Sequence, residues 1–312
     1  MLWDIALFVL GIAVLVGGAE VLVRGGSSLA KRLGMSPLMI GLTIVALGTS
    51  APELVVSANA ATTGHGDVAL GNVVGSNILN TFIVLGITAA LYPVLVQRRT
   101  VREDLPLVAA ISLLAWAMMW DGRVSRMDGA LLFLIVVPYL RHLYQRERGL
   151  DYQEAAAVVE SRHPALAALA VAGGIGLLVW GGDLVVGSGT SLARSVGVPE
   201  RVIAWTLVAF GTSAPELATS IVAAMRRRVD LAVGNVVGSN LLNILVVLGG
   251  ASLIAPIPVP DAVQFFDAPV MIGGALVLIQ FASTRFRITR PEGLALVGLY
   301  GLYLGIVIGH GL

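Results

Sequence analysis

Apolar residues occupy long, nearly continuous runs along this chain, and short polar stretches separate the runs. A helix needs about 20 predominantly apolar residues to cross the hydrocarbon core of a bilayer. Ten segments meet this requirement, at 3–23, 36–61, 68–92, 104–120, 127–144, 164–186, 199–225, 231–255, 265–284 and 292–310. Composition agrees, because 57% of the residues are hydrophobic and only 12% are charged, about half the charged fraction of soluble domains. The pattern predicts an all-α membrane protein with ten transmembrane helices.

Two blocks of the chain have nearly the same sequence. Residues 41–86 align without a gap with residues 204–249, and 27 of the 46 positions are identical. Internal similarity of this kind indicates a duplicated structural unit. Five predicted spans separate equivalent points, and because five is odd the second unit must enter the membrane in the opposite direction. We therefore expect a first five-helix repeat at 1–144, a cytoplasmic connector at 145–163 and a second, inverted five-helix repeat at 164–312.

Basic residues are distributed unevenly between the two sides of the predicted bundle. With the N-terminus outside, sixteen of the twenty Lys and Arg residues face the cytoplasm, and the four others are Arg123, Arg126, Arg194 and Arg201. Cytoplasmic loops of membrane proteins carry such an excess of basic residues. The sequence thus predicts a multi-pass protein of the inner (plasma) membrane with both termini outside.

Each copy of the repeated block contains GTSAPEL, which places a helix breaker and a carboxylate inside an apolar run. Pro52 and Pro215 lack an N–H group and crowd the carbonyl four residues earlier, and Gly48 and Gly211 weaken the helix at the same place. We expect the carbonyls around 46–48, and their counterparts in the second copy, to lose intrahelical partners. Free carbonyls at membrane depth are tolerated only where protein, water or ions occupy them.

Two carboxylates, Glu53 and Glu216, follow these prolines, and the one basic residue in the spans that carry them is Arg201, at the outer end of the second span. A charged carboxylate at the bilayer centre costs at least about 2.5–3.5 kcal/mol on insertion scales, so cations must neutralise the pair. The polar residues that recur around them in both copies all offer oxygen: Thr49, Ser50, Asn72, Ser76 and Asn80, and Thr212, Ser213, Asn235, Ser239 and Asn243. An all-oxygen ligand set suits calcium and sodium and disfavours soft transition metals.

Other classes of function find little support in the sequence. The chain has no cysteine, which excludes disulfides, thiol catalysis and thiolate metal sites. The segment from Gly64 to Asp67 fits the GxGD pattern of intramembrane aspartyl proteases, but no second Asp at mid-span is available as its partner. We expect no enzyme activity, no cofactor, no nucleic-acid partner and no obligate protein partner. The expected partners are the lipid bilayer and transported calcium and sodium ions.

The duplicated GTSAPEL and GNVVGSN motifs resemble the alpha repeats of the cation/calcium exchanger superfamily, in its sodium/calcium exchanger branch. The strong similarity covers the two 46-residue blocks, and the other spans agree in number and order. The resemblance implies ten helices, of which the second, third, seventh and eighth form a core around the ions and the first and sixth slide across it. It also implies secondary active antiport of sodium and calcium by alternating access, as in a prokaryotic sodium/calcium exchanger.

The resemblance further assigns ion ligands to residues of this chain. It implies that Glu53 and Glu216 bind calcium together with Thr49 and Thr212. For sodium the implied set is larger: Ala46, Thr49, Ser50, Glu53, Ser76, Ala209, Thr212, Ser213, Glu216 and Ser239. Asn80 and Asn243 would flank the centre of this site.

The ion that drives transport stays open between two alternatives. GTSAPEL resembles the sodium-coupled branch more than the proton-coupled one, which favours sodium. A proton/calcium antiporter could use the same glutamate pair, because protonation also neutralises carboxylates. Asn243 stands where the potassium-dependent branch has an acidic residue, so the resemblance predicts exchange that is independent of potassium.

Overall fold

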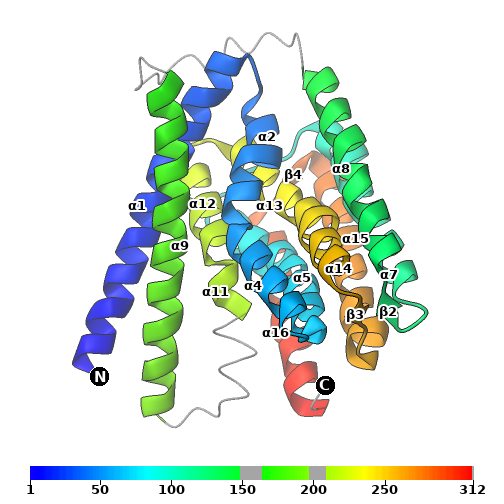
Figure 1. The fold of residues 1–312 in the computed structure, drawn as a ribbon. Helices are drawn as coiled ribbons and strands as arrows, with labels where there is room; N and C mark the ends of the chain where they lie inside the picture. Colours follow the sequence, from blue (N-terminus) through cyan, green and yellow to red (C-terminus); the bar gives the residue numbers. More distant parts are fainter. Residues whose placement is uncertain (148–163, 197–208, 311–312) are drawn as a thin grey trace.

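The computed structural model describes residues 1–147, 164–196 and 209–310, and in these ranges the chain forms a bundle of helices (Figure 1). In the first half the helices are α1 (Leu2–Leu33), α2 (Pro37–Ile40), η1 (Gly41–Val45), α3 (Ala46–Thr49), α4 (Ala51–Thr62), α5 (Gly66–Leu79), η2 (Asn80–Val84), α6 (Leu85–Leu91), η3 (Thr100–Asp104), α7 (Leu105–Met118) and α8 (Arg126–Glu147). Segments marked η have the wider π-helical winding.

The second half repeats this order of elements. Its helices are α9 (Pro164–Ser195), α11 (Ala209–Thr212), α12 (Ala214–Met225), α13 (Val229–Leu242), η6 (Asn243–Leu248), α14 (Gly249–Ile254), η7 (Val263–Asp267), α15 (Ala268–Arg285) and α16 (Arg290–His310). Four two-residue strands are the one departure from an all-α chain within the described ranges. β1 (Val94–Leu95) pairs antiparallel with β4 (Arg287–Ile288), and β2 (Arg123–Val124) pairs antiparallel with β3 (Ile257–Pro258).

The helices are those of a multi-pass membrane protein. In the described part of the chain, seven are long and apolar enough to cross a membrane, and the bent pair Pro37–Thr49 and Ala51–Thr62 makes an eighth if it counts as one span. Each of the ten predicted segments contains helix, but α7 and α12 are shorter than a full span. The first part of the predicted 199–225 segment lies outside the described residues, as does most of the 145–163 connector. The count of ten spans therefore stays a prediction.

The GTSAPEL motif breaks the helix in both copies. The axes on the two sides of Ser50 differ by 46°, and Ser213 has nearly the same backbone angles as Ser50, close to φ −89° and ψ 3°. In each copy the proline lies in the first turn of the helix that follows, where a missing N–H group leaves no hydrogen bond unmade. The predicted interruption of these two spans is thus present.

One detail of the predicted break is wrong. The Ala46 carbonyl is not free, because it accepts the Ser50 N–H at 2.9 Å and lies 3.3 Å from the Thr49 hydroxyl. The hydrogen bond lost to the proline is the one that Gly48 would receive from residue 52 in an unbroken helix. A carbonyl oxygen has two lone pairs, so the Ala46 oxygen that accepts the Ser50 N–H keeps one lone pair with which to contact an ion.

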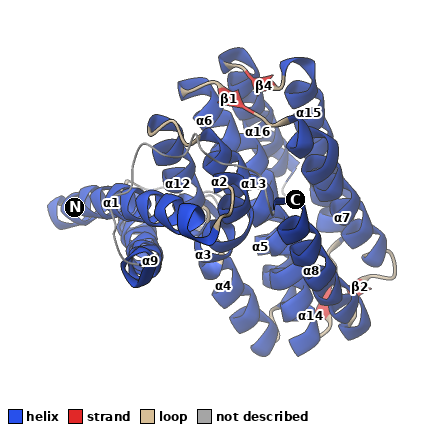
Figure 2. Ribbon diagram, turned by 90° about the horizontal axis from the view of Figure 1, so that it is seen from above, coloured by secondary structure: helices blue, strands red, loops and turns tan. Residues whose placement is uncertain are grey.

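The bundle has a buried core and an outlying pair of helices. α13 is buried almost all round, and α5 is the next most buried span. α1 and α9 pack along each other at one flank of the bundle (Figure 2). A bidentate ion pair joins this flank to the core, because the Arg226 guanidinium lies 2.7 and 2.9 Å from the two carboxylate oxygens of Glu20. Glu20 also forms an ion pair with Arg24.

Two glycines of α13 allow the two repeats to cross at very short range. A Cβ atom added to Gly238 would lie 2.6 Å from the carbonyl oxygen of Leu42, and one added to Gly234 would lie 3.0 Å from the Cα atom of Gly41. Both neighbours are backbone atoms of η1, which cannot move aside like a side chain. Close backbone approach between helices is a common use of small residues in membrane proteins.

We expect Gly238→Ala to destabilise the protein by about 1–3 kcal/mol, because the added methyl group must push α13 away from η1. The measurement is thermal unfolding of the purified protein in detergent. Gly250→Ala is the matched control, since no described atom lies within 4 Å of its added Cβ. Equal transition temperatures for the two variants would show that the crossing is not tightly packed.

Candidate ion-binding site

Two fully buried glutamates form the centre of the site, one from each repeat. Glu53 lies in the first turn of α4 and Glu216 lies in the first turn of α12, and neither has any exposed surface. The first turn of a helix presents N–H groups without intrahelical partners and the positive end of the helix dipole. The break in each span therefore creates a helix start inside the protein that favours a negative charge.

Serine hydroxyls from both repeats hydrogen-bond to these carboxylates. Ser76 of α5 donates to Glu53 Oε1 at 3.3 Å, and Ser239 of α13 donates to Glu216 Oε1 at 3.3 Å. Ser50 crosses from the first repeat to the second and donates to Glu216 Oε1 at 3.1 Å. Since each hydroxyl uses its hydrogen in this way, its oxygen lone pairs stay available to a cation. Neither repeat could build this arrangement alone.

An asparagine in each repeat fixes the helix segment that carries the glutamate. The Asn72 side chain donates to the backbone carbonyl of Glu53 at 3.2 Å and to the Ser57 hydroxyl at 2.9 Å. Its counterpart Asn235 donates to the backbone carbonyl of Glu216 at 3.3 Å. Asn235 also donates to the Ser220 hydroxyl at 3.1 Å, which is the counterpart of the bond from Asn72 to Ser57.

Thr49 joins the two repeats at the same level. Its hydroxyl lies 3.0 Å from Asn235 Oδ1 and 3.4 Å from the Ser239 hydroxyl. Because an amide oxygen can only accept, the Thr49 hydrogen points toward Asn235. Its counterpart Thr212 lies at the end of α11 and is half-buried.

Several buried polar atoms of the site have no hydrogen-bond partner among the described residues. They are Glu53 Oε2, Glu216 Oε2, Ser213 Oγ, Asn243 Oδ1 and both amide atoms of Asn80. Unpaired buried polar groups are uncommon in folded proteins and cost free energy. All but one of these atoms are oxygens, so together with the two carboxylates they form a set of hard ligands suited to calcium or sodium.

Within the described part of the chain, no Lys or Arg forms an ion pair with either glutamate, and no group of three or more acidic or histidine side chains could hold a metal ion. The site therefore contains two carboxylates and otherwise neutral oxygens. Buried charges without protein partners are very costly. A cation or a proton is the remaining means of neutralising them.

The structure brings together most residues that the sequence predicts for the site. Buried in the core are Ala46, Thr49, Ser50, Glu53, Ser76, Asn80, Ser213, Glu216, Ser239 and Asn243. Ala209 begins α11 directly after the undescribed segment 197–208. Sequence reasoning missed Ser57, Ser220, Asn77 and Asn240, although each pair recurs at the 163-residue offset and could have been found from it.

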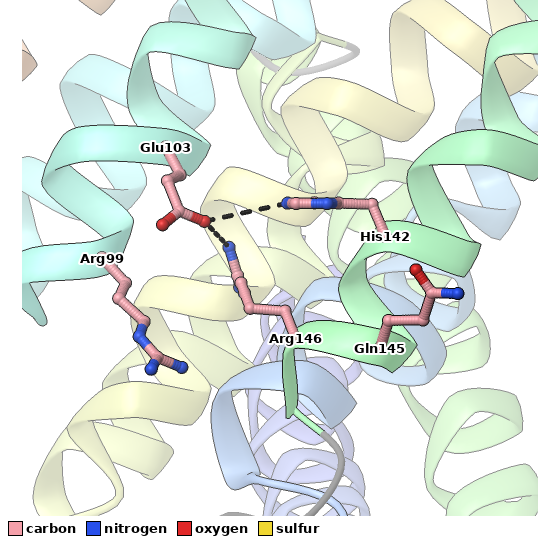
Figure 3. A pocket seen from close by; sticks show the side chains of 5 residues that line it. All are labelled: Arg99, Glu103, His142, Gln145 and Arg146. Atoms are coloured by element: carbon pink, nitrogen blue, oxygen red, sulfur yellow. Dashed lines mark hydrogen bonds and ion pairs between the residues drawn. The ribbon is translucent and has the colours of Figure 1, made fainter.

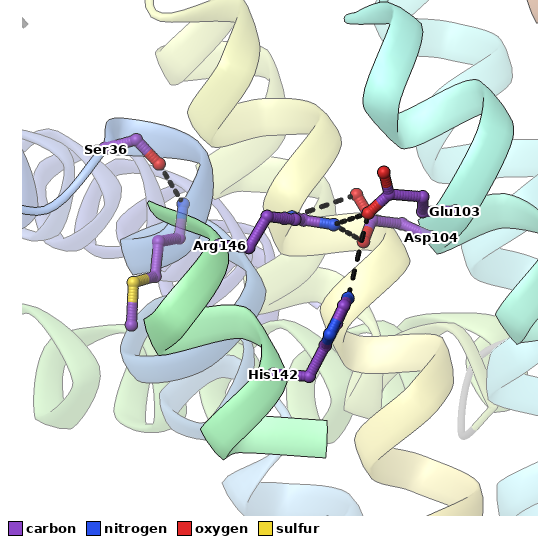
Figure 4. A network of polar contacts seen from close by, with 6 residues as sticks. Ser36, Glu103, Asp104, His142 and Arg146 are labelled. Carbon is purple, nitrogen blue, oxygen red and sulfur yellow. Dashed lines mark hydrogen bonds and ion pairs between the residues drawn. The ribbon is translucent and has the colours of Figure 1, made fainter. Parts of the chain in front are cut away.

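A separate polar pocket of about 550 Å³ lies between η3 and α8. Its lining residues are Arg99, Glu103, His142, Gln145 and Arg146 (Figure 3). Arg146 lies 2.7 Å from the buried carboxylate of Asp104 and 3.2 Å from Glu103, and His142 lies 3.8 Å from Glu103 (Figure 4). Because Arg146 already pairs with both carboxylates, this network holds the two helices together and lacks the unpartnered oxygens of the glutamate site.

Comparison with known proteins agrees with this architecture over nearly the full chain. A family profile described as "Sodium/calcium exchanger protein" matches residues 3–145 and 166–309. The chain belongs to this family. It is 38% identical to "Putative antiporter CaxA" of Alkalimonas amylolytica, over 93% of this chain and 94% of that protein. It is 30% identical to "Sodium/calcium exchanger MaX1" of Methanosarcina acetivorans, over 96% of this chain and 97% of that protein.

A solved structure shows the same fold. The sodium-calcium exchanger NCX_Mj, in crystals soaked with sodium and calcium, superposes with a TM-score of 0.84 at 28% identity and covers 99% of this chain and 98% of its own. Family membership confirms the predicted resemblance and makes the protein a membrane antiporter of the cation/calcium exchanger superfamily rather than a member of an enzyme family.

We expect Glu53→Gln and Glu216→Gln each to reduce calcium transport to the level of empty liposomes while leaving a folded protein. Either change removes half of the negative charge available to a divalent ion. The assay is ⁴⁵Ca²⁺ uptake by reconstituted protein, with size-exclusion chromatography as the test of folding.

Thr219→Val is the matched control for this prediction. Thr219 is buried one turn after Glu216 in α12, and its hydroxyl has no hydrogen-bond partner in the described structure. Valine occupies the equivalent position 56 of the first repeat. Transport should therefore remain close to that of the unmodified protein. Near-normal uptake by either glutamine variant would contradict a site made by both glutamates.

Proposed function

We propose that this protein is a sodium/calcium antiporter of the inner (plasma) membrane that works by alternating access. The observation that carries the proposal is the pair of fully buried glutamates, one from each repeat, each with an unpartnered oxygen. Calcium would bind to Glu53 and Glu216 together with the hydroxyls of Thr49 and Thr212. Two ionised carboxylates balance the charge of one calcium ion.

Sodium would bind in the same place with more ligands. Its ligands would be the carboxylates and hydroxyls above, the carbonyls of Ala46 and Ala209, and the hydroxyls of Ser50, Ser76, Ser213 and Ser239. Both ions then compete for the same two charges. An empty site, with two unneutralised charges, would cross between its states only at high cost, which couples the movement of one ion to that of the other.

The packing of the helices suggests which parts move. α1 and α9 lie together on the flank of the core (Figure 2), and the Glu20–Arg226 ion pair is a polar link between α1 and the end of α12. Sliding of the outlying pair along the core would open the site to one side and then to the other. In the predicted topology of ten spans, with both termini outside, the Glu20–Arg226 pair lies toward the cytoplasm.

Proton/calcium antiport is the second candidate. Two buried carboxylates without a basic partner can be neutralised by protons as well as by sodium, so the same glutamate pair would serve. The name of the relative from Alkalimonas amylolytica specifies an antiporter without naming its ions, whereas the name of the Methanosarcina relative specifies sodium and calcium. We favour sodium because of the name of the Methanosarcina relative and because many neutral oxygens, which a proton would not need, surround the two carboxylates.

Transport into proteoliposomes tests the proposal directly. Vesicles loaded with sodium and diluted into choline medium should accumulate ⁴⁵Ca²⁺, and an imposed pH gradient without sodium should not drive uptake. Uptake that follows the pH gradient alone would establish the proton-coupled alternative. Calcium flux in the absence of both gradients, down its own gradient and without saturation, would indicate a passive channel.

We also expect that calcium uptake will not change when potassium is replaced by choline. Asn80 and Asn243 supply only neutral amides, so the charge at the centre is −2, which one calcium ion balances with nothing left for a co-transported cation. Asn243→Asp adds a carboxylate and should change the ion dependence of transport, through a new requirement for a monovalent cation or through inhibition by protons. A strict potassium requirement in the unmodified protein would refute this role of Asn243.

Two equivalent positions test the inverted topology. Thr62 and Met225 end α4 and α12, are both exposed, and occupy the same position in the two repeats. Because the chain has no cysteine, Thr62→Cys and Met225→Cys each introduce a single thiol. An impermeant maleimide added to intact cells should label Thr62→Cys only, and Met225→Cys should react only after permeabilisation. Labelling of both from one side would exclude inverted repeats.

A further inference from the structure

Asn77, Asn240 and Asn243 are connected by a chain of buried amide hydrogen bonds. The Asn77 side chain donates through Nδ2 to the backbone carbonyl of Asn240 at 3.1 Å and contacts the Met271 sulfur at 3.6 Å. Its Oδ1 accepts a hydrogen bond from Asn243 Nδ2 at 3.2 Å. Asn77 and Asn240 are equivalent residues of the two repeats, and both are buried.

The first bond of this chain fixes the orientation of the others. A backbone carbonyl can only accept, so Asn77 must turn its NH₂ group toward Asn240. The Asn77 oxygen then faces Asn243, which must donate to it through its own NH₂ group. The Asn243 oxygen is thereby left at the opposite end of the amide, buried and without a partner among the described residues.

The location of Asn243 explains why the orientation of its amide matters for an ion at the glutamates. Its backbone N–H bonds to the carbonyl of Ser239, one helical turn earlier, and the Ser239 hydroxyl bonds to Glu216. Asn243 therefore continues the polar stripe that faces the glutamates. An amide oxygen is a good ligand for sodium or calcium, whereas an NH₂ group repels a cation.

We propose that Asn77 is a positioning residue that holds the amide of Asn243 with its oxygen available to the transported ion, and so sets the cation affinity of the site. This inference rests on the proposed function of the glutamate site. Asn77 itself contacts no ion in this arrangement. Its effect passes through the side chain of Asn243.

The equivalent half of the structure lacks this arrangement. There the bond would run from Asn80 Nδ2 to Asn240 Oδ1, but both atoms are buried without partners in the described structure. Asn240 instead donates to the Thr81 hydroxyl at 3.0 Å. The residue equivalent to Thr81 is Ile244, which has no hydroxyl to draw Asn77 away from Asn243. One substitution between the repeats thus accounts for the difference.

The test is calcium binding by purified protein in detergent, measured by isothermal titration calorimetry, in a double-mutant cycle. Asn77→Ala either leaves the Asn243 NH₂ group without a hydrogen-bond partner or lets the amide turn its oxygen away from the ion. Either change costs about as much free energy as leaving one buried polar group unpaired. We expect calcium to bind about tenfold more weakly as a result. In transport, KM for calcium should rise while the maximal rate changes less.

The second arm of the cycle uses Asn243→Asp. A carboxylate has two equivalent oxygens, so an oxygen faces the ion whichever way the group is turned. Asn77→Ala should therefore cause little or no loss of affinity in the Asn243→Asp background. A general loosening of the core would instead weaken binding by the same factor in both backgrounds, and that result would overturn the proposal.

Thr88→Val is the matched control. Thr88 is fully buried in the first repeat and its hydroxyl donates to the carbonyl of Val84. The substitution removes this buried hydrogen bond but none made by Asn77, Asn240 or Asn243, so calcium affinity should stay within about twofold of the unmodified protein. If Asn77→Ala does not fold, Asn77→Ser replaces it in both backgrounds, because a serine side chain is too short to bridge Asn240 and Asn243.

The outcomes separate the two proposals. If the unmodified protein binds no calcium, the proposed function fails. If it binds calcium and Asn77→Ala binds it equally well, the proposed function stands and the positioning role of Asn77 is wrong.

Discussion

Two negative charges buried inside an apolar bundle are the constraint on which the rest of this structure depends. Neither Glu53 nor Glu216 has exposed surface or a basic partner among the described residues. The protein reduces the cost of burying them by placing each in the first turn of a helix and by directing serine hydroxyls toward one oxygen of each. The second oxygen of each is left unpaired, and that incomplete neutralisation is what suits the site to a cation.

The packing of the core follows from the need to bring these charges together. Ser50 can reach Glu216, and Thr49 can reach Asn235, only because η1 crosses α13 at close range. Gly234 and Gly238 allow that approach, since any side chain there would meet the backbone of η1. The small residues of GNVVGSN therefore serve the site as well as the fold. A side chain at Gly238 would separate polar residues of the site that belong to different repeats.

Much of this arrangement could be predicted from the sequence because it depends on local chemistry and on duplication. The apolar runs predict the helices, and the proline and glycine of GTSAPEL predict the breaks at Ser50 and Ser213. The π-helical segments and the two short strand pairs could not be predicted, since they depend on how distant elements pack. The same holds for the Arg146–Asp104 ion pair, whose partners are 42 positions apart in the chain.

Asn77 shows a different limit of sequence reasoning. It follows Ser76 directly, so helical spacing assigns it to another face than the stripe of Asn72, Ser76 and Asn80. Its importance comes from a contact with Asn240, which lies 163 positions away at the equivalent place in the second repeat. Duplication of GSN in the two motifs is the one signal in the sequence that could have drawn attention to it.

The differences between the repeats matter as much as their similarity. If the two halves were identical, the inward-open and outward-open states of an inverted-repeat antiporter would be related by symmetry and would have equal free energy. Arg226 breaks that symmetry, because it clamps Glu20 of α1 while the equivalent residue of the first repeat is the uncharged Thr63. Thr81 breaks it again within the core, where it draws Asn240 away from Asn80. At these positions the two repeats are therefore not equivalent, so they can favour one arrangement of the helices over its two-fold-related counterpart, which the duplicated polar residues of the site cannot do.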